Sequence, residues 1–278
     1  MKNKYIANVQ TDIYLGSGAG REIRKKIETA RKGILVVSPF LSGTRPDQQG
    51  NTALCSLLVQ KAETGVPVTL VTTEEAFRAS IDNPIYALVN QMRVDDRRAI
   101  ENKAKIQLRA KFWTVLNIVL AFFCGISFFA FDWLSLSITA TGLVALSLFL
   151  NQIPYNKSKT IRTFYYVYRA KGNLNIKILK SFNSRQEKEK ISTLHSKVYC
   201  IDSIVAYIGS MNYTESGFKY NFEGRAKIKD AAAVVEIENH WQQLFYDNSI
   251  PAIPLESLAK YYFEHAMPLQ KLSRFRRH

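Results

Sequence analysis

The sequence predicts an α/β fold that is interrupted by a long helical hairpin, and three observations lead to this prediction. Short continuous apolar runs at residues 34–39 and 66–72 alternate with helical spacing, which is typical of buried strands in an α/β layer. Strand-like runs resume after residue 165. Between these two parts lies a stretch, residues 112–150, whose only charged residue is Asp132.

The elements follow one another in a consistent order. Residues 5–15 form an opening strand or loop, and residues 21–32 show helical spacing that Gly33 ends. A second helix is expected over 51–64 before Gly65, and a later amphipathic helix over 231–245. Strands are expected at 34–39, 66–72, 173–179, 197–201 and 205–209. Residues 1–75 and 165–250 therefore read as one α/β module, with 76–164 inserted into it and 251–278 left as a basic C-terminal tail.

Composition places the chain among folded proteins. It has 278 residues, of which 47% are hydrophobic, so it can bury a sizeable core and is neither disordered nor fibrous. Its three cysteines, Cys55, Cys124 and Cys200, lie far apart in no metal-ligand spacing, which argues against a disulfide scaffold and a zinc ribbon. The N-terminus has no apolar run of the secretory type. These features predict a cytosolic location for the α/β module.

The apolar stretch predicts a transmembrane hairpin. Asp132 divides it into 112–131 and 133–150, which are 20 and 18 residues long and therefore span roughly 27–30 Å as helices, the thickness of a bilayer core. Basic residues precede the pair at Arg109 and follow it at Lys157. By the positive-inside rule we expect a cell-membrane protein with two spans, its α/β module and both termini being cytoplasmic. A buried helical hairpin in a soluble core or an oligomer interface is the alternative.

The positive charge is concentrated in three segments. The chain carries 38 Lys and Arg against 23 Asp and Glu, for a net charge of +15. Residues 84–111 hold seven basic and three acidic side chains, and residues 155–190 hold ten and two. The last ten residues add four more positive charges. Such segments attract polyanions, and the sequence alone leaves open whether the partner is nucleic acid or an anionic membrane face.

One stretch of polar residues indicates chemistry on a phosphodiester. His195 and Lys197 fall two residues apart on one strand face, so that Lys197 neutralises the non-bridging oxygens while His195 attacks phosphorus. Ser210 and Asn212 have the same spacing and are candidate hydrogen-bond partners of those oxygens. Glu223 is the candidate carboxylate that holds the imidazole in its reactive tautomer.

These residues carry a resemblance to a known family. The pattern H-x-K-x4-D-x6-G-S-x-N resembles the signature of the phospholipase D superfamily, and this chain matches it at His195, Lys197, Asp202, Gly209, Ser210 and Asn212. Glu223 follows at the distance familiar in small members with a single motif. The resemblance implies a mixed sheet flanked by helices, and it implies Asp202 as a site residue, for which we expect a structural role.

The resemblance also implies a mechanism. It is a two-step hydrolysis through a phosphohistidine at His195, without a metal ion or other cofactor, in which a second histidine protonates the leaving oxygen. The other histidines, His240, His265 and His278, lie in no second motif. Members of the superfamily with a single motif dimerise, so the resemblance implies an obligate homodimer with one composite active site.

The substrate is left between nucleic acid and phospholipid. The run from 209 to 218, with Asn221 and Glu223, looks most like the nuclease-type branch, in which Phe218 or Tyr220 would stack on bases. A phospholipase D or phosphatidyltransferase acting on anionic membrane phospholipids is the alternative, because the hairpin would hold the site near lipid headgroups. A catalytically inactive, membrane-anchored module that senses phosphate groups is a third interpretation.

Overall fold

The computed structural model describes residues 9–41, 52–77, 83–131, 134–180 and 194–258. It divides into two compact units, one formed by Met1–Met92 together with Val167–His278 and the other by Arg93–Tyr166. The tail and the predicted turn at Asp132 fall outside the described residues, apart from the start of the tail. The chain therefore leaves the first unit once and returns to it after the helical insertion.

Ten strands and seven α-helices are assigned within the described residues. The strands are β1 (Thr11–Gly16), β2 (Ile34–Val37), β3 (Val68–Thr73), β4 (Val89–Asp95), β5 (Phe164–Ala170), β6 (Leu174–Leu179), β7 (Lys197–Ile201), β8 (Val205–Gly209), β9 (Glu223–Ile228) and β10 (Ala252–Ile253). The helices are α1 (Gly20–Thr29), α2 (Leu54–Glu63), α3 (Ile85–Leu88), α4 (Arg97–Phe131), α5 (Leu134–Thr160), α6 (Glu215–Lys219) and α7 (Ala231–Tyr246).

Eight of the strands form one mixed sheet. Its order is β1-β9-β8-β7-β2-β3-β6-β10, while β4 and β5 form a separate pair. The contacts of β3 with β2 and with β6 are parallel, and the other pairings in the large sheet are antiparallel. The predicted α/β fold with a mixed sheet flanked by helices is confirmed.

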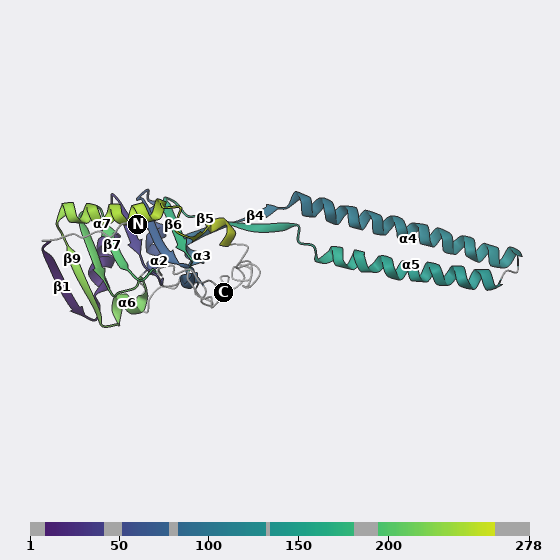
Figure 1. Ribbon diagram of the computed structural model, residues 1–278, viewed down its shortest axis with the longest axis horizontal. Coiled ribbons are helices and arrows are strands. Elements are labelled where there is room, and N and C mark those ends of the chain that lie inside the picture. The colour runs from purple at the N-terminus through teal and green to yellow at the C-terminus, as the bar shows by residue number, and fades with distance from the viewer. Residues whose placement is uncertain (1–8, 42–51, 78–82, 132–133, 181–193, 259–278) are drawn as a thin grey trace. The chain divides into compact units, whose positions relative to one another are not determined.

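Helices cover both faces of the large sheet. Figure 1 shows α7 lying across the strands, and its Val234 and Ile237 pack with Val37 and Val198 in one apolar cluster. Side chains alternate along a strand, so the residues next to Val198, which are Lys197 and Tyr199, face the opposite side, toward α1 and α2. The strands in the middle of the sheet are consequently buried on both faces, which explains their continuous apolar runs.

The elements that were expected correspond to β2, β3, β6, β7, β8, α1, α2 and α7 in the structure. The strand β9 was not expected. It alternates Glu223, Arg225 and Lys227 with small residues, a pattern that reads as a polar loop. In the structure, Arg225 and Lys227 pair with Glu22 of α1, and Glu223 accepts a hydrogen bond from Ser210. A linear sequence does not show such partners.

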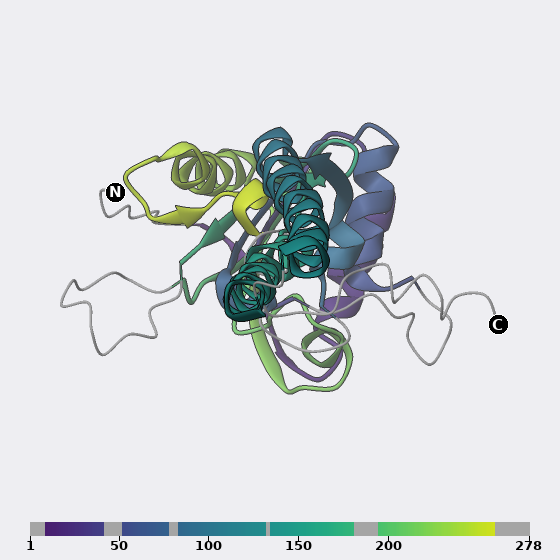
Figure 2. The same ribbon diagram turned by 90° about the vertical axis from the view of Figure 1, so that its right-hand side faces the viewer.

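In the second unit, α4 and α5 run side by side as an antiparallel pair (Figures 1 and 2). Among the described residues, α4 alone passes the length and composition test for a helix that could cross a membrane. Over Arg97–Phe123 its most apolar 18-residue window has a mean hydropathy of 1.3 and is 11% buried.

Candidate active site

Strand pairing brings the predicted site residues, apart from Asp202, together at one end of the strands. Lys197 opens β7 and pairs with Gly209, the last residue of β8. Gly209 pairs in turn with Arg225 of β9, so Glu223, at the start of β9, lies at the same end. His195 precedes β7, and Ser210 follows β8 directly. Residues from three successive segments of the chain therefore meet at this end of the sheet.

Lys197 and His195 are in direct contact. The ammonium Nζ of Lys197 donates to the backbone oxygen of His195 at 2.7 Å and lies 3.5 Å from its ring Nδ1. Lys197 is only 5% exposed, and burial lowers the pKa of its ammonium, an effect that the negative charge of Glu223 opposes. His195 itself is exposed. The site thus offers an accessible imidazole beside a fixed positive charge.

Ser210 and Glu223 form a second polar pair across β8 and β9. The hydroxyl of Ser210 donates to Glu223 Oε2 and accepts from the backbone N–H of Gly224 at 3.1 Å. Asn221 Nδ2 donates to the other carboxylate oxygen at 3.3 Å. No hydrogen bond joins Glu223 to His195 in the described part of the chain. The expected role of Glu223, holding the imidazole, is therefore not seen here, and its carboxylate orients Ser210 instead.

Asn212 has an unused polar atom. Its side-chain Oδ1 is buried and has no hydrogen-bond partner in the described part of the chain. Buried polar groups are nearly always paired, so an exception requires an explanation. A half-turn of the amide would place its NH₂ group at the same point. Because that point is closed to solvent, the side chain would have to turn away from it to donate a hydrogen bond to a bound oxygen.

Three aromatic side chains form a rigid support beneath these residues. Tyr199, Tyr213 and Phe218 are fully buried, with ring centroids 5.2–6.1 Å apart. Tyr199 donates to the backbone oxygen of Met211 at 2.6 Å, and burial raises the pKa of its phenol well above the usual value. Phe218 is thus unavailable for stacking on a base, contrary to one expectation. Tyr220 is 64% exposed and remains available.

Asp202 lies at the other end of β7, on the order of 15 Å from Lys197 by the rise of a strand. Its carboxylate accepts from the backbone N–H groups of Arg31 at 3.0 Å, Lys32 at 2.6 Å and Gly33 at 3.1 Å. The backbone of Asp202 is left-handed, with φ 55°. The structure therefore does not bring Asp202 to His195, and its contacts tie the link between α1 and β2 to the end of β7.

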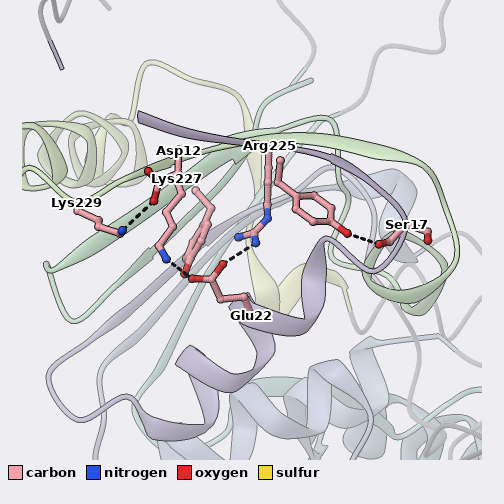
Figure 3. A network of polar contacts seen from close by, with 8 residues as sticks. Asp12, Ser17, Glu22, Arg225, Lys227 and Lys229 are labelled. Carbon is pink, nitrogen blue, oxygen red and sulfur yellow. Dashed lines mark hydrogen bonds and ion pairs between the residues drawn. The ribbon is translucent and has the colours of Figure 1, made fainter. Parts of the chain in front are cut away.

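A charged network joins α1 to β8 and β9, and no pattern in the sequence predicts it. Glu22 of α1 accepts from Arg225 Nη2 at 2.6 Å, from Lys227 Nζ and from Tyr207 at 3.1 Å; Figure 3 shows Glu22 between Arg225 and Lys227. Burial would raise the pKa of Glu22, but hydrogen bonds from Lys227 and Arg225 outweigh it and lower the pKa to about 2. Only a hydrophilic residue on an amphipathic helix was visible in the sequence.

Among the described residues, no group of three or more His, Cys, Asp or Glu side chains is arranged to hold a metal ion.

Comparison with known proteins gives a family match over part of the chain. Residues 144–245 match the family model described as cardiolipin synthase, PLD-like domain. No curated protein matches the chain significantly by sequence.

The chain is similar in structure to several solved proteins. NucT from Helicobacter pylori has 11% identity and a TM-score of 0.44, with 88% of this chain and 100% of that chain covered. The phospholipase D family member Nuc from Salmonella typhimurium has 13% identity and a TM-score of 0.40, with 88% and 99% covered. Phosphatidylserine synthase from Haemophilus influenzae has 9% identity and a TM-score of 0.42, with 96% and 44% covered.

Proposed function

We propose that this chain, which contains a phospholipase D-like domain, is a membrane-anchored phosphodiesterase that acts through a covalent phosphohistidine. One observation carries the proposal: the imidazole of His195 lies beside the buried ammonium of Lys197. Ser210, Asn212 and Glu223 stand at the same end of the strands. A nucleophile, a fixed cation and hydrogen-bond donors are what a phosphoryl group in transfer requires.

The proposed reaction has two steps. In the first, a ring nitrogen of His195 attacks phosphorus, the bond from phosphorus to the leaving oxygen breaks, and an acid protonates that oxygen. In the second, water attacks phosphorus, the bond from phosphorus to nitrogen breaks, and the same group accepts the proton from water. Lys197 and Asn212 stabilise the charge on the non-bridging oxygens, while Ser210, whose hydroxyl donates to Glu223, helps to position the end of β9. No step requires a metal ion, so we expect turnover in EDTA.

The acid of this scheme is proposed to be His195 of a second copy of the chain. Within the described residues the other histidine is His240, on α7, which covers the opposite face of the sheet. A two-fold axis would place two copies of His195 on either side of one phosphodiester. The exposed apolar side chains Leu15 and Phe222 flank the end of the sheet that carries Glu223, and they supply apolar area for such a dimer.

Mixing experiments test the composite site. Wild-type chains and His195→Ala chains would be co-refolded or co-expressed in varying ratio, and phosphodiesterase activity measured. A site that needs both copies of His195 predicts activity that falls with the square of the wild-type fraction. A linear fall, or activity from a strictly monomeric species, contradicts the homodimer proposal.

Nucleic acid is the proposed substrate. The run from Gly209 to Phe218, with Asn221 and Glu223, resembles the nuclease-type branch. The exposed ring of Tyr220 lies near the site, three residues from Glu223 in sequence, and is free to stack on a base. The test is cleavage of short DNA and RNA by the full-length protein in EDTA. Cleavage that disappears in His195→Ala supports a nuclease.

A lipid substrate is the second candidate, because the matching family model is described as cardiolipin synthase, PLD-like domain. Mixed phospholipid vesicles would be supplied in a parallel assay. Released headgroup or transferred phosphatidyl product, again lost in His195→Ala, would identify a phospholipase D or phosphatidyltransferase. Binding of phosphate ligands without turnover on either substrate, unaffected by His195→Ala, would indicate an inactive binding module.

Membrane anchoring through two spans, with the domain and both termini in the cytoplasm, is part of the same proposal. It is supported by the composition of α4 and by the outward-facing apolar side chains of the hairpin, such as Phe112, Phe122 and Phe149. We expect the protein to stay with membranes through an alkaline carbonate wash. Complete recovery in the soluble fraction without detergent contradicts anchoring.

A further inference from the structure

In the helical hairpin, polar side chains lie between the helices and apolar side chains point outward, the reverse of the arrangement in a water-soluble helical bundle. Asn117 is only 3% exposed, and its Nδ2 donates to Ser147 Oγ at 3.0 Å between the helices. Asn151 Nδ2 donates to the backbone oxygen of Ala110 at 2.8 Å and lies 3.2 Å from Thr114 Oγ1. Large apolar side chains point outward instead: Phe112, Val115, Ile118, Phe122, Phe123, Leu146, Phe149, Leu150 and Ile153 are each more than half exposed. Polar seams and apolar exteriors are characteristic of helices packed in lipid.

The interhelical hydrogen bonds determine which residues of α4 and α5 lie at the same level. Ala110 is level with Asn151, and Asn117 is level with Ser147. Because the helices are antiparallel, the segment 103–111 of α4 therefore lies alongside 152–160 of α5. This part of the hairpin is about 12 Å long, and it adjoins the exposed apolar surface on both helices.

Six cations surround the hairpin at this level, and we call them the basic collar: Lys103, Lys105, Arg109, Lys111, Lys157 and Lys159. All are exposed except Lys103, which is partly buried. The sequence holds no Asp or Glu from 102 to 131 or from 133 to 186, so Glu101, one helical turn before Lys105, is the acidic residue nearest to the collar in sequence and the collar keeps a net positive charge. Aromatic side chains mark the boundary, with Trp113 half exposed and Tyr155 under the ammonium of Lys159 at 4.8 Å. This is the order of side chains found at a membrane–water interface.

We propose that the basic collar is a binding site for the headgroups of anionic phospholipids. This inference rests on the proposed membrane insertion of the hairpin and adds a lipid preference to it. A ligand that covers the collar and the adjoining surface must present negative charge next to hydrocarbon, and an anionic bilayer surface does so. A nucleic acid would match the six cations but would leave the apolar side chains beside them in water.

The expected preference is large enough to measure. A basic side chain at an anionic surface gains about 1 kcal/mol, which is roughly fivefold in a binding constant. Charge attraction of this kind falls with salt, because the screening length shrinks from about 10 Å at 0.1 M to about 3 Å at 1 M. A preference due to the collar should therefore weaken at high salt.

The test compares lipids at the surface of the full-length, reconstituted protein. Brominated phosphatidylglycerol and brominated phosphatidylcholine, which quench tryptophan, would be titrated separately into phosphatidylcholine vesicles that contain the protein, at 0.1 M and 1 M salt. We expect phosphatidylglycerol to bind about fivefold or more tightly at low salt. The variant Lys105→Gln/Arg109→Gln/Lys157→Gln/Lys159→Gln should lose this preference, and Lys105→Arg/Lys157→Arg/Lys159→Arg should keep it.

A matched control separates the collar from net charge. The variant Lys25→Gln/Lys26→Gln/Arg31→Gln/Lys32→Gln also removes four positive charges, but from exposed positions on or next to α1. This variant should keep the preference for phosphatidylglycerol. An unchanged preference in the collar variant overturns the proposal, as does a collar variant that loses affinity for an oligonucleotide but still selects phosphatidylglycerol. Wild-type protein that washes off the vesicles overturns membrane anchoring as well. Integration without lipid selectivity overturns the collar alone.

Discussion

At the scale of the residue, the candidate site divides its polar side chains between chemistry and support. The ring of His195 and the side-chain oxygen of Asn212 have no strong hydrogen-bond partner among the described residues. Ser210, in contrast, donates a hydrogen bond to Glu223. Asp202 matches the sequence signature as well as any of them, yet its carboxylate is used entirely on backbone N–H groups of residues 31–33. Membership of a motif therefore does not determine the role of a residue.

Asn212→Ala should reduce activity without reducing stability. Its side-chain oxygen has no partner to lose, while removal of one hydrogen-bond donor from a transition state costs about 10²–10³ in rate. The measurements are kcat/KM on a phosphodiester and the midpoint of thermal unfolding. Asn175→Ala, an exposed position on β6, is the matched control and should change neither. A marked loss of stability in Asn212→Ala would show that the amide supports the fold.

Asp202→Asn should have the opposite effect. Asparagine tolerates the left-handed backbone at this position, so the substitution tests the negative charge that accepts three backbone N–H bonds. We expect a loss of about 1–3 kcal/mol in the free energy of unfolding, measured by denaturant titration. Activity at a temperature where the variant is folded should stay within about twofold of wild type, and a loss similar to that of His195→Ala would assign Asp202 to the chemistry.

At the scale of the element, the close approach of β8 and β9 holds the site together. Gly209 ends β8, and a β-carbon there would collide with the backbone oxygen of Gly224. The same approach allows the backbone of Ser210 to donate to Gly224 at 3.0 Å and brings its hydroxyl to Glu223. The glycine of the motif thus has a packing reason that is separate from catalysis.

Gly209→Ala should destabilise the first unit and misplace Ser210. Overpacking against backbone, which cannot rotate away, costs about 1–3 kcal/mol, and we expect the upper part of that range together with lost activity. Gly33→Ala is the control, because a β-carbon there meets nothing closer than the backbone oxygen of Pro67 at 3.8 Å. Thermal unfolding of both variants gives the comparison, and equal effects would contradict the packing argument.

The link between α1 and β9 should give the protein an acid-sensitive component. The pKa of Glu22 falls from its usual 4.5 to about 2 in the folded state, so its stabilising effect is present above pH 4.5 and is lost as the pH falls toward 2. The unfolding midpoint of wild type should drop over this range. Glu22→Gln should be less stable at pH 6 and should show a shallower acid dependence; parallel curves would contradict this role.

At the scale of the whole molecule, the chain combines an α/β unit with an inserted hairpin. The insertion leaves and returns through neighbouring strands, because the backbone N–H of Asp96 donates to the oxygen of Thr163 at 2.8 Å. Because the two ends of the insertion lie this close together, a short loop can join them. The core of the large sheet is formed by residues outside the insertion, such as Val37, Val198 and Val234.

Replacement of residues 97–160 by a short Gly/Ser loop should yield a folded protein that needs no detergent. We expect native-like circular dichroism from the sheet and retained hydrolysis of a small soluble diester such as bis(p-nitrophenyl) phosphate, abolished by His195→Ala. Activity on membrane-bound substrate should fall relative to the soluble diester. A replaced chain that aggregates or fails to fold would show that the hairpin is part of the folding unit.

Much of this organisation was readable from the sequence, and the reason is local. Continuous apolar runs predict buried strands such as β2, β3 and β7, and helical spacing of apolar residues predicts α7. The motif residues were found because their spacing along two strands is fixed by chemistry. No sequence pattern predicts the strand β9 or the network at Glu22, since their charged side chains are held by partners up to 205 positions away in the sequence.

The sequence by itself determined the α/β class, the place of the insertion and the candidate residues of the proposed phosphodiester site, because apolar period and motif spacing are properties of neighbouring residues. Only the tertiary structure decided how those residues are used. Strand pairing placed Lys197, Ser210 and Glu223 at one end of the sheet and Asp202 at the other. Helix packing buried Phe218, turned the polar side chains of Asn117 and Asn151 inward and gathered the collar cations at one level. Such contacts depend on register between distant segments, and that register arises only when the chain packs.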